Sequence, residues 1–190
     1  MQPLASAVHQ QRINELDLHD ILPVFVPAAL VGSEDWKNPF RDLPAGGVAL
    51  SWAALGAGDM VRYVSYETLR KWEAQGIDWR ARAIENLRAR SPERLGTGAL
   101  FRDSGETWLI SLTYPDGLGP SRLLLTAELA RIFPHGYRVA LPDQNRAFAF
   151  AKHLDREDSD TVENLIQRSF LNSARPLVHG IFEPADLVAL

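Results

Sequence analysis

The chain has 190 residues, of which 46% are hydrophobic and 23% charged, with eight Phe, five Trp and four Tyr to fill a core. This composition excludes a chain that is disordered throughout, because such chains lack apolar surface to bury. A net charge of −4 and a pI of about 5.7 argue against a whole-molecule attraction to nucleic acid or anionic membranes. The absence of cysteine excludes disulfides, a thiol nucleophile and cysteine metal clusters.

The first part of the chain predicts a strand followed by a loop. Residues up to about Asp20 could form one short helix. The segment Ile21–Leu30 is apolar and contains Val and Phe, which favours a strand. Pro23 and Pro27 favour an edge position for this strand, because proline cannot donate a ladder hydrogen bond. Residues 32–47 hold several Gly and Pro residues and predict a loop.

The next part predicts a hairpin followed by two helices. Residues 48–52 alternate large and small side chains, residues 56–59 are rich in glycine, and residues 61–64 return as a second strand. Ser at the start of 65–74 and Asp at the start of 78–90 are good N-caps, so both segments are predicted to be helices.

Two more units of the same kind follow in the second half. The first has strands at 99–101 and 107–113, with a helix over 126–133 that Thr126 caps. The second has strands at 137–141 and 146–151. Both faces of the last strand are apolar, which predicts a central position in the sheet.

The chain ends with a predicted helix from about Ser159 to Asn172. Asp160 and Glu163 have the spacing of a capping box at its start. A hairpin followed by helix, three times, predicts an α+β fold with an antiparallel or mixed sheet built from hairpins and with helices packed on it. The spacings differ and the three units share no evident residue identity, so chance succession is favoured over duplication.

The chain contains no linker long enough to divide it. We therefore expect a single α+β domain over 1–190, with an N-terminal segment at 1–20 and a C-terminal tail at 175–190. The N-terminus lacks the apolar core of a signal peptide. The longest apolar run, Ile21–Val31, contains two prolines and is too short to span a bilayer. The expected location is the cytoplasm, without membrane association.

Several short segments together resemble the YtpQ-like family of uncharacterised bacterial proteins, over roughly residues 20 to 175. They are Ile21–Val24, Arg62–Val64, Ala83–Leu87, Leu123–Leu129 and Tyr137–Arg146. The most specific piece is Pro142-Asp143-x-Asn145-Arg146, where the family tends to have a proline followed closely by Arg-Asp. Ala147 follows the arginine here, so the acid of that pair is missing. The resemblance implies a bacterial cytosolic α+β protein and brings no established activity.

The clearest candidate ligand site is the turn that holds Asp143, Asn145 and Arg146. Arg146 could bind a carboxylate or phosphate while Asp143 orients it or acts as a base, with Arg62 and Tyr63 as further candidate ligand residues. The favoured alternative is turn chemistry, in which Asp and Asn bond neighbouring backbone groups and the arginine is solvated.

A second candidate is a run of arginines on and after the second predicted helix, which could contact the phosphates of a nucleic acid. Its members are Arg80, Arg82, Arg88, Arg90 and Arg94. Only one aromatic residue, Trp79, is near, whereas single-strand binding usually interleaves several. A solvated face that pairs with acids elsewhere is therefore favoured, and nucleic acid binding is not expected.

The sequence carries no recognisable cofactor, metal or nucleophile motif. The acids around His153 lack the two-histidine helical spacing of common zinc enzymes, and no Gly-x-Ser-x-Gly occurs. Trp36 lies among polar residues, where it could anchor a partner. The leading hypothesis is thus a non-catalytic protein-binding module that docks through Trp36 and the proline-containing strand. An enzyme or binder of an anionic small molecule is the alternative, and the oligomeric state is left open.

Overall fold

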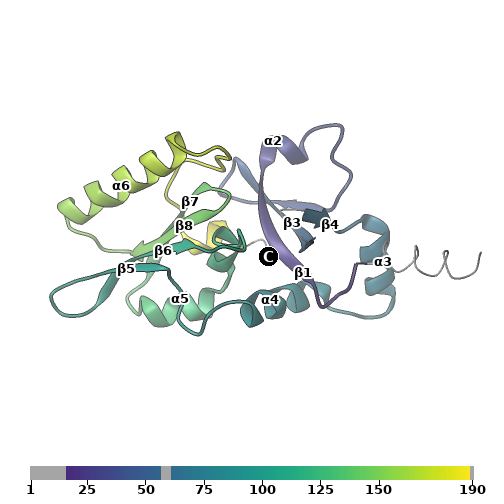
Figure 1. Ribbon diagram of the computed structural model, residues 1–190, viewed down its shortest axis with the longest axis horizontal. Helices are drawn as coiled ribbons and strands as arrows, with labels where there is room; N and C mark the ends of the chain where they lie inside the picture. Colours follow the sequence, from purple (N-terminus) through teal and green to yellow (C-terminus); the bar gives the residue numbers. More distant parts are fainter. Residues whose placement is uncertain (1–15, 57–60, 189–190) are drawn as a thin grey trace, which may run out of the picture.

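Two antiparallel sheets with helices around them form the computed structural model, which describes residues 16–56 and 61–188 (Figure 1). The predicted α+β class is confirmed. The strands are distributed over two sheets, because the chain forms one sheet before residue 64 and starts a second at residue 98.

The first sheet is centred on β3 (Val48–Leu55). One side of β3 pairs with β1 (Ile21–Pro27), and the other side pairs with β2 (Phe40–Asp42) and β4 (Val61–Tyr63). β1 lies at the edge, as its two prolines predict. The short β2 lies in the segment that was predicted to be loop throughout.

The second sheet has the order β5-β6-β8-β7, which places β8 (Arg146–Ala151) centrally, as predicted. The other strands are β5 (Gly98–Phe101), β6 (Thr107–Thr113) and β7 (Tyr137–Asp143). The predicted hairpins β5–β6 and β7–β8 supply two strands each, and β6 pairs with β8 to join them.

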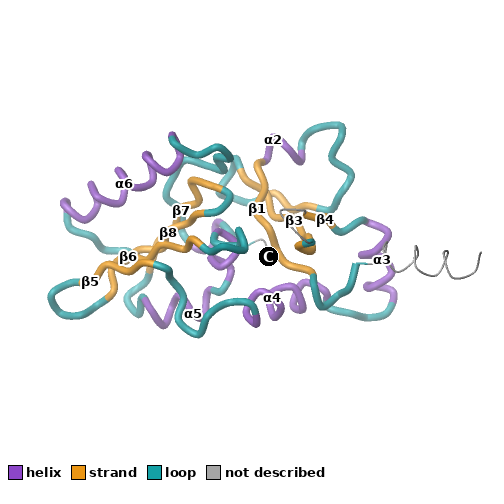
Figure 2. Tube along the Cα trace, viewed as in Figure 1, coloured by secondary structure: helices purple, strands orange, loops and turns teal. Residues whose placement is uncertain are grey.

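The helices lie around and between the two sheets (Figure 2). They are α2 (Ala28–Val31), α3 (Tyr66–Ala74), α4 (Trp79–Ala89), α5 (Thr126–Ile132), α6 (Arg156–Leu171) and the 3-10 helices η1 (Pro120–Leu124) and η2 (Pro184–Asp186). The predicted caps of α3 and α4 are confirmed, because Ser65 accepts from Thr68 N–H and Asp78 accepts from Ala81 N–H.

Two predicted helix starts are wrong. α6 begins at Arg156 and its cap is Asp155, whose carboxylate accepts the N–H of Asp158 at 2.9 Å. Asp160 therefore lies inside the helix, because the earlier carboxylate already satisfies a free N–H of the first turn. Thr126 is the first residue of α5 and makes no side-chain cap.

A main buried cluster contains side chains from both sheets and from the helices between them. Trp52 of β3 and Trp79 of α4 meet edge to face in this cluster, with ring centroids 4.8 Å apart. Ile110 of β6 and Val139 of β7 belong to the same cluster. Burying each such side chain contributes roughly 1.5–3 kcal/mol, so the two sheets are stabilised together.

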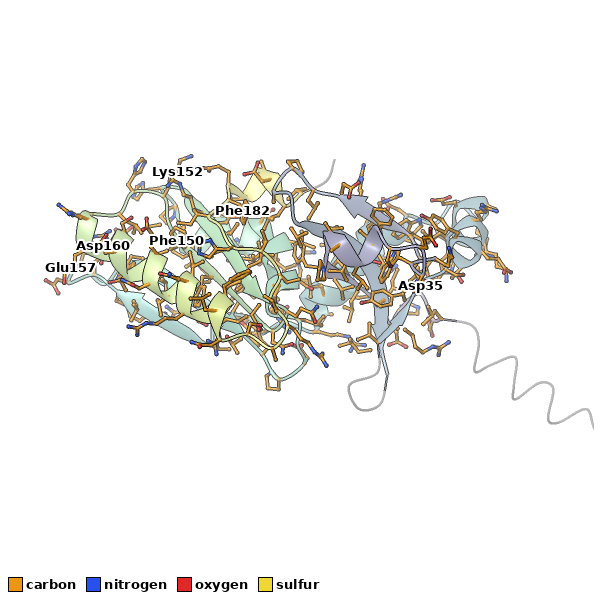
Figure 3. The ribbon with its side chains drawn as sticks, turned by 90° about the horizontal axis from the view of Figure 1, so that it is seen from above. Asp35, Phe150, Lys152, Glu157, Asp160 and Phe182 are labelled. Carbon is orange, nitrogen blue, oxygen red and sulfur yellow. The ribbon has the colours of Figure 1, made fainter. Side chains whose placement is uncertain are left out.

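A second cluster lies between α6 and the other face of the second sheet. Val162 and Ile166 of the helix pack with Trp108, Phe148 and Phe150. The predicted apolar stripe of this helix thus covers the sheet, because residues four apart lie on one helix face. Phe150 lies between the sheet and α6 in the view of Figure 3.

The segment predicted as a C-terminal tail is part of the folded structure. Its backbone pairs with β7 through Val139 and Phe182, and Leu187 is only 1% exposed in the main cluster. The backbone N–H of Ala45, next to the first sheet, donates to Asp186 O at 3.2 Å. The tail therefore covers the outer edge of β7 and connects the two sheets.

Two predictions concern positions outside the described residues. The short N-terminal helix falls almost entirely on residues 1–15, and the glycine-rich turn at 56–59 falls largely on 57–60.

Candidate functional site

Asp143, Asn145 and Arg146 lie in the turn between β7 and β8, as predicted. The carboxylate of Asp143 accepts the backbone N–H of Asn145 at 2.7 Å and the hydroxyl of Ser173. Asn145 and Arg146 are exposed, and the Arg146 side chain makes no ion pair with any described residue. These contacts are the ones expected from turn chemistry, in which the Asp143 carboxylate bonds to neighbouring groups of its own turn and Arg146 is solvated.

The other two candidate ligand residues, Arg62 and Tyr63, belong to β4 on the first sheet. The structure therefore does not place them in the same turn as Arg146. The ring of Tyr63 contacts Trp36 edge to face, with centroids 4.6 Å apart. Burial raises the pKa of the Tyr63 phenol above its usual value, so this residue stays protonated at neutral pH.

Trp36, the predicted docking residue, is partly used within the fold. It is half-buried against Tyr63 and the outer face of the first sheet, and its indole N–H donates to Asn38 O at 2.7 Å. The proline-containing strand β1 is also buried, with Ile21 and Leu22 at 0% exposure. Trp36 and β1, which together suggested a docking surface, are therefore largely covered by other parts of the protein.

Each arginine of the predicted basic face has a partner within the molecule. Arg80 lies over the ring of Trp79, 4.1 Å from its centroid, and Arg94 lies 6.0 Å from the ring of Phe101. The remaining three pair with acids: Arg82 with Glu85, Arg88 with Glu128, and Arg90 with Asp20. This is the pairing with acids that the sequence favoured.

A buried charged network lies between α4, β6 and η1, and the sequence did not single it out. Arg122 is 1% exposed, and its guanidinium donates to both carboxylate oxygens of Asp116, at 2.9 and 2.7 Å. It also donates to Ser91 Oγ and Arg90 O, and it lies 3.8 Å from the ring centroid of Tyr114. The one sequence signal was a lone arginine within an apolar run.

The electrostatics of this network favour the ion pair. Burial opposes ionisation of Asp116, but hydrogen bonds from Arg122 and from the N–H of Leu118 outweigh it, and the pKa of the carboxyl is lowered. Four of the five guanidinium N–H donors bond to described residues, and the ring of Tyr114 covers one face of the group, so its donors serve mainly the fold. The network therefore has a structural role: it joins the end of α4, the turn after β6 and η1.

The outer edge of β5 exposes apolar side chains. Leu100 is 43% exposed and Phe101 52%, and β5 pairs only with β6 among the described strands. The other edges differ: β7 is covered by the C-terminal segment, β1 is buried, and β2 and β4 have three residues each. β5 therefore offers unpaired backbone groups beside apolar side chains.

A cleft of about 510 Å³ lies at the end of the second sheet, near the β5–β6 hairpin. Its lining residues come from three segments: Arg102, Glu106, Phe133, His135, Gly136, Ala151, Lys152, His153, Leu154 and Asp155. Lys152 lies at this end of the molecule, whereas Asp35 in the loop of Trp36 lies over the first sheet (Figure 3). The cleft was not predictable from the sequence, because its three segments are far apart in the chain.

Neither a cluster of metal ligands nor a membrane-spanning helix occurs among the described residues. No group of three or more metal-ligating side chains that could hold an ion occurs there. No helix in residues 16–56 or 61–188 is long and apolar enough to cross a membrane.

Comparison with known proteins finds no matching family model, no matching curated protein and no matching solved structure. The resemblance to the YtpQ-like family stays a prediction.

Proposed function

We propose that this protein is a non-catalytic binding module that accepts an extended segment of a partner protein as an added strand along β5. The observation that carries the proposal is the uncovered edge of β5, where Leu100 and Phe101 are about half exposed. Natural proteins usually protect such edges with lysine or proline, or by covering them. β5 contains neither residue, although a bulge between Leu100 and Phe101 interrupts its register.

The recognition would combine backbone and side-chain contacts. An added strand pairs its N–H and C=O groups with the free edge, and its alternate side chains then meet the side chains on one face of the sheet. Leu100 and Phe101 are consecutive, so the partner would meet one of them on each face of the sheet, which favours an apolar segment. Arg94, whose guanidinium lies 6.0 Å from the Phe101 ring, adds a positive charge beside the edge. We therefore expect a segment with apolar residues and an acidic neighbour.

Substitution of the edge tests this function. The double variant Leu100→Lys and Phe101→Lys places two charges on β5 and should abolish partner capture, because an added strand would then bury them. Both side chains are exposed, so the stability should change by only about 0.5 kcal/mol per substitution. The measurement is affinity purification from the cells that make this protein, followed by reconstitution with the recovered partner. Amide exchange of β5 should slow on binding.

Leu171→Lys is the matched control, because Leu171 is 69% exposed and lies at the end of α6, away from β5. This variant should capture the partner normally. A partner lost equally from both variants, or reconstituted binding that leaves exchange of the β5 amides unchanged, would show that the edge is not the docking site. Sedimentation could instead detect self-association that is lost in the double variant. That result would show that β5 binds a second copy of this chain and not a different partner protein.

A further inference from the structure

The cleft at the end of the second sheet has walls that backbone hydrogen bonds hold in place. The turn between α5 and β7 and the segment after β8 are joined by the N–H of Lys152, which donates to Gly136 O at 3.0 Å. Gly136 has φ of +91°, a left-handed conformation that glycine adopts without strain. Arg102 reaches from the β5–β6 hairpin to His153 O at 3.5 Å. The three segments therefore form a cleft that needs little ordering before a ligand binds.

Several hydrogen-bond donors line the cleft. Arg102 and Lys152 each pair with one carboxylate outside the lining, Asp158 at 3.3 Å and Glu183 at 3.1 Å. Because a guanidinium has five N–H donors and an ammonium three, both groups keep donors for a ligand. The imidazoles of His135 and His153 have no hydrogen bond to another described residue, and each can donate as well.

Two acids also lie in the lining, and both oppose a bound anion. The carboxylate of Asp155 accepts Asp158 N–H as the cap of α6, which occupies one of its oxygens but leaves its negative charge in place. Glu106 is exposed and is the second negative charge that a bound anion would meet. One wall is apolar and consists of Phe133, Ala151 and Leu154. The lining therefore combines donors with an apolar surface, in a volume typical of small-molecule sites.

We propose that this cleft binds a small organic acid, with its carboxylate among Lys152, Arg102 and the two histidines and its apolar body against Phe133 and Leu154. The proposal goes beyond strand addition at β5 and does not depend on it. It differs from the turn of Asp143 and Arg146 because three chain segments, rather than one, contribute to the lining.

The test uses phenylacetate as the probe, with NMR detection of the imidazole resonances of His135 and His153. Saturable shifts of both residues are expected. Phenylacetamide, which has the same ring without the charge, and acetate, which lacks the ring, should each bind at least tenfold more weakly. Equal binding of the amide, or no saturable shift with phenylacetate, would overturn the proposal.

Three variants locate the site. Lys152→Gln should weaken phenylacetate binding roughly fivefold, the effect of one exposed ion pair of about 1 kcal/mol. Glu106→Gln should tighten binding by a similar factor, a gain that a damaged fold would not produce. His179→Gln is the control, because His179 packs against Phe170 outside the lining and its loss should change nothing.

Unchanged affinity in both Lys152→Gln and Glu106→Gln would show that the probe binds elsewhere. Inorganic phosphate is the last arm of the experiment. If it shifts the same histidines as tightly as phenylacetate does, the cleft is a general anion site and the assignment to organic acids is wrong.

Discussion

Arg122 is a charged residue within an apolar run, and the structure explains why it is tolerated there. Its guanidinium meets Asp116, Ser91 Oγ, Arg90 O and the face of Tyr114, so that four of its five N–H donors have partners. A buried charge that is paired and hydrogen-bonded in this way is stable, whereas loss of one partner leaves the other uncompensated. The network therefore holds the end of α4, the turn after β6 and η1 in one arrangement.

Replacing Arg122 by Met should lower the free energy of unfolding by about 3 kcal/mol, because Asp116 loses its charged partner. Urea denaturation at pH 7 measures this change. Arg82→Met is the control: Arg82 and Glu85 form an exposed pair, and its loss should cost less than about 1 kcal/mol. Equal effects of the two substitutions would contradict a locking role for the buried pair.

The stability difference between the wild type and Arg122→Met should also depend on pH. The pKa of Asp116 is lowered in the folded protein below its ordinary value of 3.8, so its ionised form stabilises the fold above that pH. The contribution is lost as the pH falls through the lowered pKa. The stability difference between the wild type and Arg122→Met should therefore shrink in acid, and a difference constant from pH 7 down to acid would contradict the assignment.

At the scale of single elements, η1 can approach β6 and β8 only because residue 119 is glycine. A Cβ at Gly119 would lie 2.2 Å from Leu112 O and 2.7 Å from Asn145 O, both of which are backbone atoms that cannot move easily. Gly119→Ala should therefore destabilise the protein by about 3 kcal/mol or more, through displacement of η1.

Gly98→Ala is the matched control, because a Cβ at Gly98 meets nothing within 4 Å and its φ is not positive. Its effect should lie within about 1 kcal/mol and could be stabilising, since alanine reduces the entropy of the unfolded chain. Thermal unfolding of the two variants gives the comparison. A Gly119→Ala protein that melts like the Gly98→Ala protein would show that η1 can shift without cost.

Elements with strong local signals were predictable from the sequence, and those set by distant contacts were not. Ser65 and Asp78 cap their helices as expected, and the apolar faces of β8 placed it centrally, because these signals lie within a few residues. β2 was missed because its pairing with β3 comes from tertiary context. Asp143 was recognised as a turn residue, but Ser173, its second partner, lies 30 residues away in the chain.

At the scale of the whole molecule, the C-terminal segment pairs with the second sheet and bonds to the loop beside the first. Leu187 is 1% exposed, whereas its neighbour Val188 is 38% exposed. Leu187→Ala should lower the free energy of unfolding by about 2–5 kcal/mol, and Val188→Ala by less than about 0.5 kcal/mol. Chemical denaturation of both variants checks this. Similar small effects would mean that the segment is only loosely attached.

The two-sheet arrangement and the cleft were beyond sequence reasoning for one physical reason. The three hairpin–helix units were visible locally, but nothing local specifies that β6 pairs with β8 or that the first hairpin stays in a separate sheet. The cleft arises from that pairing, since it brings the β5–β6 hairpin, the start of β7 and the end of β8 to one end of the sheet.

The covering of β7 by the segment around Phe182 has a consequence for growth of the sheet. A sheet with two open edges can recruit one molecule after another and extend without limit. Here the β7 edge of the second sheet is already paired with the segment around Phe182, so this sheet can be extended only at β5. When two copies pair through β5, neither has a second open edge in this sheet, so assembly stops at the pair instead of continuing into a fibre.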